Sequence, residues 1–136
     1  MIVYVDTSVV LRHLLGQPDA IDWKHWQAAV TSEILGVEVR RVMDRLRLGS
    51  ILDDEGVAKA RQEFTRMERS LSLIALTRTV LHRAALPMPT VVKTLDALHL
   101  ASAMLYQERR GEELVFATHD HQQATGARAL GFEVIG

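Results

Sequence analysis

Residues 2–8 have the sequence IVYVDTS, in which a short run of β-branched and aromatic residues ends at an aspartate. A run of this length and composition predicts a buried β-strand over residues 2–5. The polar residues that begin at Asp6 carry side-chain oxygens that cap helix N-termini, and an apolar segment follows them as far as Gly16. The stretch therefore predicts a strand that is followed directly by a helix over about residues 9–15.

Strand and helix patterns continue to alternate along the rest of the chain. Apolar residues recur at Leu35, Val39, Val42 and Leu46, which is the spacing of one face of an α-helix. Short and almost wholly apolar runs separate this segment from other helical segments. The further predicted strands are residues 29–32, 71–76, 113–117 and 132–135, and the further predicted helices are residues 19–29, 34–47, 55–69, 79–85, 94–107 and 121–130.

Short apolar strands that alternate with helices are typical of a parallel sheet whose two faces are covered by helices. We therefore expect the α/β class and a three-layer sandwich with a central parallel sheet. The chain has 136 residues, without repeats, low-complexity stretches or linker-like segments. A single domain over residues 1–136 is expected, large enough to bury one hydrophobic core.

The composition excludes several classes of protein. The absence of cysteine excludes disulfide scaffolds, zinc fingers, iron–sulfur clusters and thiol catalysis. The net charge of −1 gives no positive field for general DNA binding, although a small site can bind phosphate through metal ions. No apolar run reaches the roughly 20 residues of a membrane span, and the N-terminal segment carries Asp6 and Arg12, unlike a signal peptide. We expect a cytoplasmic protein without membrane contact.

Two aspartates follow predicted strands. Asp6 ends the first strand, and Asp120 lies between the strand of residues 113–117 and the next helix. Because ligands of open α/β sheets bind at the carboxyl ends of the strands, both residues are candidates for one site at the same edge of the sheet. Each could instead be only the N-cap of the helix that follows it.

Two further acids lie in apolar surroundings on predicted helices. Glu38 borders the buried face of the helix of residues 34–47, whereas Glu33, the competing acid, precedes that helix and could cap it. Asp96 lies in the first turn of the helix of residues 94–107, where a carboxylate also stabilises the helix dipole. Its apolar neighbours argue against a fully solvated position and make Asp96 a candidate site residue.

Four segments carry these acids in order along the chain. They are MIVYVDTS (residues 1–8), SEILGVEVRR (32–41), LDALHLASA (95–103) and FATHD (116–120), followed by a closing strand in ALGFEVI (129–135). Their order and content resemble the motifs of the PIN-domain nucleases, and more narrowly those of the VapC-type toxins of bacterial toxin–antitoxin pairs. The third segment is the most specific of them, and the likeness covers nearly the whole chain.

The resemblance implies a metal-dependent ribonuclease site. The catalytic residues that would hold Mg²⁺ or Mn²⁺ for hydrolysis of RNA phosphodiester bonds are Asp6, Glu38, Asp96 and Asp120. Asp6 and Asp96 would be the primary metal ligands, and Ser8 and Thr118 would hydrogen-bond the carboxylates. Hard carboxylate oxygens without thiolates suit these cations.

The same resemblance implies three partners. The first is an RNA substrate. The second is a small VapB-type antitoxin, whose C-terminal segment would bring an arginine to the acids along a groove between the helices of residues 34–47 and 55–69. The third is a second copy of the chain, because apolar surface around the second and third predicted helices, including Trp23 and Trp26, is hard to cover within one sandwich. The two tryptophans could also stack on RNA bases, but packing in the core or in a dimer is the favoured interpretation.

Basic residues near the acids allow two interpretations. Arg40 and Arg41 are candidates for RNA binding through phosphates, but the same helix face could simply pair with Asp44. The histidines closest to the acids in sequence are His99, His119 and His121. They lack the His-x-x-x-His pair of a typical catalytic zinc site, which favours packing and surface roles for them.

Two other classes of protein that use an aspartate at the end of a strand require residues that this chain lacks. A haloacid-dehalogenase phosphatase needs a second aspartate two residues after the first, where this chain has Ser8, and a response-regulator receiver needs a late lysine that is absent. A solitary PIN-domain nuclease that processes RNA without an antitoxin fits the four acids. A PIN-like module that only binds RNA or protein fits less well, because an idle site gains nothing from clustered like charge.

Overall fold

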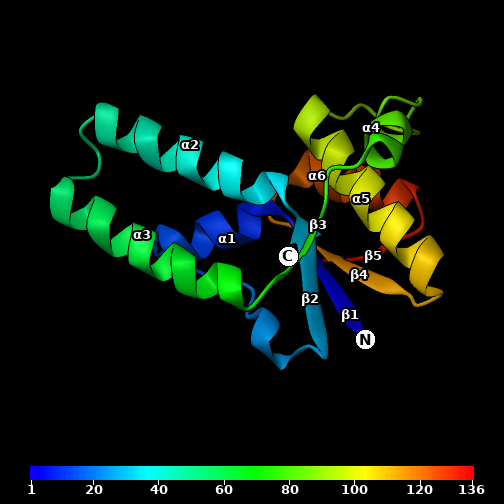
Figure 1. Cartoon of the computed structure of the whole chain (residues 1–136), viewed down its shortest axis with the longest axis horizontal. Coiled ribbons are helices and arrows are strands. Elements are labelled where there is room, and N and C mark those ends of the chain that lie inside the picture. Colours follow the sequence, from blue (N-terminus) through cyan, green and yellow to red (C-terminus); the bar gives the residue numbers. More distant parts are fainter.

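The computed structural model describes residues 1–136 and contains a central sheet of five strands in the order β3-β2-β1-β4-β5 (Figure 1). Every neighbouring pair of strands is parallel. The strands are β1 (Ile2–Val5), β2 (Ala28–Ser32), β3 (Ser72–Ile74), β4 (Leu114–Ala117) and β5 (Glu133–Ile135). The first strand of the chain thus lies in the middle of the sheet.

Helices cover both faces of the sheet (Figure 1). They are α1 (Thr7–Leu14), α2 (Ile34–Leu48), α3 (Asp54–Arg69), α4 (Arg78–Ala84), α5 (Thr94–Arg110) and α6 (His121–Ala129). One hydrophobic core forms between the sheet and α1, α2 and α3, and a second forms between the sheet and α5 and α6. The predicted α/β class with a central parallel sheet in a sandwich is confirmed.

The alternation of side chains along β1 explains why the sheet has two cores. Val3 and Val5 belong to the core on the side of α1–α3, while Ile2 and Tyr4 belong to the core on the side of α5 and α6. All four residues of β1 are buried. A strand buried on both faces must be apolar throughout, which is the pattern that the sequence shows.

The pairing of β1 with β4 brings two distant parts of the chain together at the carboxyl edge of the sheet. Val5 lies beside Ala117, and the Asp6 amide donates a hydrogen bond to the Ala117 carbonyl at 3.0 Å. The residues that follow these two strands are therefore neighbours in space. This edge is the place where the sequence predicts a site.

The predicted helix over residues 19–29 is wrong. The structure has only a short 3₁₀ turn at Trp23–His25 there, and β2 begins at Ala28. The Asp22 side chain caps this turn by accepting a hydrogen bond from the Lys24 amide, and the turn directs Trp23 inward. Local polar capping and burial of the indole outweigh the helical spacing of the apolar residues.

The expectation that the tryptophans lie on an exposed surface is also wrong. Trp23 is 4% exposed, and its indole Nε1 donates a hydrogen bond to the Ser70 hydroxyl at 2.9 Å. Trp26 is partly buried and packs against the core on the side of α1–α3. Neither residue offers the free aromatic surface that the dimer prediction required.

The helices α2 and α3, with the turn between them, form an antiparallel pair that we call the arm, which extends beyond the sheet in Figure 1. Asp53 caps α3 by accepting a hydrogen bond from the Gly56 amide at 2.7 Å. The end of the arm nearest the sheet carries Glu38. No helix in the structure has the length and apolar character needed to cross a membrane.

Candidate active site

Asp6 lies at the carboxyl end of β1 and is 4% exposed. Its Oδ2 accepts hydrogen bonds from the Ser8 hydroxyl at 2.6 Å and the Thr118 hydroxyl at 2.9 Å, with the Ser8 amide at 3.4 Å. Its Oδ1 accepts no hydrogen bond. One oxygen of the carboxylate is therefore fixed by the protein, and the other is available to a ligand.

The two hydroxyl groups that bind Asp6 also fix the loop after β4. Ser8 Oγ accepts a hydrogen bond from the His119 amide at 2.9 Å, and Thr118 Oγ1 accepts one from the Asp120 amide at 3.1 Å. These bonds join the N-terminus of α1 to the segment that leads into α6. The structure therefore places Ser8 and Thr118 between the two aspartates that follow β1 and β4.

Glu38 comes from the second turn of α2. Its Oε1 accepts a hydrogen bond from the Thr7 hydroxyl at 2.9 Å and lies 2.6 Å from Nε2 of His99. Its Oε2 takes part in no hydrogen bond. Glu33, the competing acid, is exposed and forms no side-chain capping bond at the start of α2.

Asp96 and Asp120 bring two more carboxylates to the same edge. Asp96 lies in the first turn of α5, and Asp120 caps α6 by accepting a hydrogen bond from the Gln123 amide at 2.9 Å. Burial raises the pKa of Asp96 to about 6, and the negative charges of Asp6, Asp120 and Glu38 add to this effect. The negative charges of the three other predicted acids therefore act on the carboxyl group of Asp96.

The four carboxylates have the chemistry of a divalent-cation site. No three His, Cys, Asp or Glu side chains converge closely enough to form a ready cage for a metal ion. The oxygens Oδ1 of Asp6 and Oε2 of Glu38 are nevertheless without hydrogen-bond partners. Burial raises the pKa of Asp96 most, and the repulsion by neighbouring carboxylates that adds to it is an effect that a cation would relieve. Hard oxygen donors of this kind fit Mg²⁺ or Mn²⁺.

His99 is a site residue that the sequence analysis assigned to packing. It lies one turn after Asp96 on α5, is fully buried, and has its Nε2 3.9 Å from Oδ1 of Asp6. Burial alone would lower the pKa of His99, but the hydrogen bond to Glu38 and the neighbouring negative charges outweigh it and raise the pKa. The signal available in the sequence was a histidine three residues after a candidate acid, on the same helix face.

The two other histidines close to the acids in sequence occupy different positions. His119 lies in the loop before α6, and burial lowers its pKa, with the charges of Arg12 and His13 adding to the effect. His121 is exposed at the first position of α6.

The arginines proposed to contact RNA are engaged within the arm. Arg40 donates a hydrogen bond to the Gly36 carbonyl at 3.1 Å and lies 3.6 Å from a carboxylate oxygen of Glu68. Arg41 pairs with Asp44 at 3.2 Å. Both guanidinium groups are more than half exposed, so these pairs hold them only weakly.

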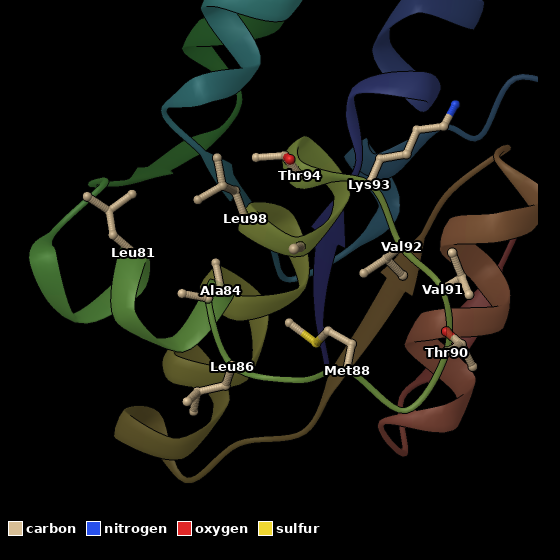
Figure 2. Close-up of a pocket in the computed structure, with 12 residues that line it drawn as sticks. Leu81, Ala84, Leu86, Met88, Thr90, Val91, Val92, Lys93, Thr94 and Leu98 are labelled. Atoms are coloured by element: carbon tan, nitrogen blue, oxygen red, sulfur yellow. The ribbon is translucent and has the colours of Figure 1, made fainter.

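An apolar groove with a volume of about 570 Å³ lies between α4 and the start of α5 (Figure 2). Its side chains come from α4, from residues 86–93 and from the first turns of α5, and include Leu81, Leu86, Met88, Val91 and Leu98. A smaller hollow of about 280 Å³ lies between the two helices of the arm and is lined by Arg40, Met43, Arg61, Phe64 and Thr65. The main apolar groove therefore lies on α4 and α5 and not on the arm.

Comparison with known proteins gives a consistent result. A family model described as PIN domain matches residues 3–128. Ribonuclease VapC47 of Mycobacterium tuberculosis (strain CDC 1551 / Oshkosh) is 28% identical over 138 residues, which cover 96% of this chain and 93% of the relative. Ribonuclease VapC46 of M. tuberculosis (strain ATCC 25618 / H37Rv) is also 28% identical, over 98% of this chain and 95% of its own. Among solved structures, a chain of a toxin–antitoxin complex from Klebsiella pneumoniae has a TM-score of 0.63 at 20% identity, covering 98% of this chain and 96% of that one.

Proposed function

Because this chain belongs to the PIN domain family, we propose that it is a ribonuclease toxin that hydrolyses RNA with the help of Mg²⁺ or Mn²⁺. The observation that supports the proposal is that Asp6, Glu38 and Asp120 lie near enough to Asp96 for their charges to act on it. The charges of the other three acids act on Asp96, whose pKa is raised to about 6. The likeness in sequence to two proteins named as ribonucleases, over almost their whole length, supports the same activity.

Each acid has a distinct role in this proposal. Asp6 and Asp96 would hold the cation, and Glu38 and Asp120 would complete the site directly or through water. When bound, the cation lowers the pKa of a water molecule and neutralises charge that develops on the phosphate. Ser8 fixes Oδ2 of Asp6 through the 2.6 Å hydrogen bond, so that Oδ1 points to one defined place.

The test is cleavage of structured RNA by the purified chain with Mg²⁺, with Mn²⁺ or with EDTA. Asp96→Asn should lower the cleavage rate by about 100-fold or more, because the neutral amide is a poor ligand for a hard cation. Removal of the cation by EDTA should have an equal effect. Glu33→Gln is the matched control and should leave the rate unchanged, since Glu33 is exposed and makes no site contact.

Two results would contradict this assignment. Full activity of Asp96→Asn in the matched assay would show that the acids are not the catalytic centre. Cleavage that persists at the same rate in EDTA would contradict the metal. Circular dichroism of each variant verifies that the fold survives, as we expect when one charge leaves a repulsive cluster.

The toxin role requires a small antitoxin, and the electrostatics of the site support one. An arginine from such a partner could bond two of the carboxylates at once and so relieve their repulsion in place of the cation. The hollow on the arm combines apolar Met43 and Phe64 with the cations Arg40 and Arg61, which suits an amphipathic segment that carries acidic residues. Expression of the chain alone should then arrest growth, Asp6→Asn should relieve the arrest, and co-expression with the small neighbouring reading frame should restore growth.

A solitary nuclease that processes RNA is the second candidate function, because it would use the same four acids. RNA cleavage in vitro without any growth arrest in vivo would favour it over the toxin. Absence of cleavage with every cation would favour a binding module.

A further inference from the structure

We propose that His99 is a positioning residue, which holds Glu38 in the orientation used for RNA hydrolysis and is itself held by Tyr4. This inference deepens the proposed function and rests on it for the reaction, but its structural part can be tested alone. None of the four acids supplies this contact. It comes from the fully buried His99 of α5.

The hydrogen bonds around His99 form a directed chain. Oε1 of Glu38 can only accept, so the ring nitrogen 2.6 Å away, Nε2 of His99, must carry a proton. The other ring nitrogen, Nδ1, lies 2.7 Å from the Tyr4 hydroxyl, and this hydroxyl accepts a hydrogen bond from the Ser32 amide at 3.1 Å. In the neutral ring, Tyr4 donates to Nδ1, and this bond selects the tautomer that donates to Glu38.

The members of this chain come from separate elements of the fold. Tyr4 lies on β1, His99 on α5 and Glu38 on α2, so the chain connects the central strand of the sheet to both helices. Tyr4 and His99 are fully buried, and burial keeps water from replacing a lost partner. The Tyr4 ring stacks on Phe116 with 5.0 Å between ring centroids and meets the His99 ring edge-on at 5.8 Å. Packing therefore holds both rings in one orientation.

Hydrogen bonds within the protein already occupy one of the two carboxylate oxygens of Glu38. Oε1 accepts hydrogen bonds from Nε2 of His99 and from the Thr7 hydroxyl, which leaves Oε2 for a ligand. The same Nε2 lies 3.9 Å from Oδ1 of Asp6, between two carboxylates that would otherwise repel each other. Without the imidazole, the Thr7 hydroxyl alone would hold Oε1 of Glu38, and the carboxylate would be less firmly oriented toward Asp6.

The first test is ¹⁵N NMR of the histidine rings in the intact chain without divalent cation. We expect His99 to show a protonated Nε2 at pH 7.5, with a resonance that His82→Gln, a change at an exposed histidine of α4, leaves in place. A bare Nε2 with the proton on Nδ1 alone would overturn the proposal. This measurement does not depend on any catalytic activity.

The second test compares two amides at residue 99. The nitrogen of glutamine reaches the place of Nε2, and the nitrogen of asparagine reaches only the place of Nδ1. His99→Gln should keep kcat within about threefold, while His99→Asn should lower kcat about 10- to 100-fold, with KM for RNA unchanged in both. The affinity for Mn²⁺, measured by calorimetry, should follow the same order. Equal losses in the two variants would indicate a packing role and would overturn the proposal.

Tyr4→Phe removes the hydroxyl that contacts Nδ1 of His99 and leaves the imidazole in place. It should lower kcat about tenfold, because the ring loses the partner that selects its tautomer, whereas Tyr106→Phe on α5 should change nothing. Unchanged kcat in Tyr4→Phe would contradict the role of Tyr4. If the unmodified chain cleaves no RNA, the proposed function fails, and the NMR and Mn²⁺ measurements still decide the role of His99.

Discussion

Asp6 and Asp120 each serve two purposes, which the sequence analysis treated as alternatives. Both are N-caps of the helices that follow them, and both lie at the carboxyl edge of the sheet beside the other acids. The two roles use different atoms in Asp6, because Oδ2 meets the capping donors and Oδ1 has none. A helix cap is thus also a means of aiming a carboxylate, and finding one does not argue against a site.

At the scale of single residues, we expect Asp96→Asn to stabilise the fold at neutral pH in the absence of divalent cations. Burial and the charges of Asp6 and Asp120 raise the pKa of Asp96 from 3.8 to about 6. A carboxyl group whose folded-state pKa is raised binds its proton more tightly in the folded state, so stability falls as the pH rises from 3.8 through about 6. The side chain is only half-buried, and solvent screening limits the gain to about 1 to 2 kcal/mol.

Thermal unfolding in EDTA at pH 7.5 and at pH 3.5 measures this effect. The variant should unfold at a higher temperature than the unmodified chain at pH 7.5 and at an equal temperature at pH 3.5, where both side chains are neutral. Mg²⁺ should raise the transition of the unmodified chain more than that of the variant. Equal transitions at pH 7.5 would show that Asp96 is not under the repulsion described here, and Glu113→Gln, at an exposed position, provides the control.

At the scale of elements, the packing of α6 depends on Gly126. A Cβ at this position would lie 2.9 Å from Cγ1 of Val92, 3.2 Å from Cδ1 of Leu100 and 3.3 Å from Oγ1 of Thr90. The β-branched Val92 has little freedom to move aside. We expect Gly126→Ala to lower the free energy of unfolding by about 1 to 2 kcal/mol, since overpacking exceeds the gain in helix propensity.

Urea unfolding tests this prediction against a second helical glycine. A Cβ at Gly36 would meet the end of the Arg40 side chain at 2.7 Å, and this flexible group can move away. Gly36→Ala should therefore be neutral or stabilising by up to about 1 kcal/mol. Destabilisation of both variants by the same amount would show that the contact with Val92 is not the cause.

The sequence predicts helices and strands correctly where the spacing of apolar residues and the capping residues agree. It fails where the two conflict. The long helix α5 was expected to end near residue 107 but continues to Arg110, because Gly111 adopts the left-handed conformation (φ +66°) that ends a helix. The segment before β2 has helical spacing but folds as a turn around the buried Trp23. In both places the outcome depends on a backbone conformation or a tertiary contact that apolar spacing does not encode.

The four acids of the proposed site could be singled out from the sequence because each lies in a motif of its own, and their catalytic role stays a prediction. The role of His99 could not be predicted in this way, since its partners Glu38 and Tyr4 are 61 and 95 residues away in sequence. A buried histidine looks like a core residue until the fold shows what its nitrogens contact. Contacts between segments that far apart cannot be read from local patterns.

At the scale of the whole molecule, the apolar groove of Figure 2 is lined by several exposed apolar side chains. Leu86 is 58% exposed and Val91 is 82% exposed, and the neighbouring Leu81 and Leu95 are nearly half exposed. Apolar side chains that are exposed around a groove are candidates for an interface. We expect a homodimer formed through this surface, in place of the tryptophan-lined surface suggested by the sequence.

Sedimentation equilibrium at micromolar concentration tests this expectation. The unmodified chain should sediment at twice its mass of 15.3 kDa, and Leu86→Glu should sediment as a single chain, because a charge would be buried without a partner. Leu48→Glu, at a leucine at the far end of the arm that is 69% exposed, should remain a dimer. A 15.3 kDa species for the unmodified chain would contradict the prediction.

The central place of β1 also governs when the proposed site can assemble during synthesis of the chain. The first strand cannot complete the sheet until β4 has been made, and Asp6 is separated by 112 residues from Thr118, the hydroxyl that binds it. At typical elongation rates of 5 to 20 residues per second, this interval lasts roughly 6 to 22 s. Throughout that time the growing polypeptide contains Asp6 but not yet Asp120. The proposed site therefore cannot assemble until translation of the chain is almost finished.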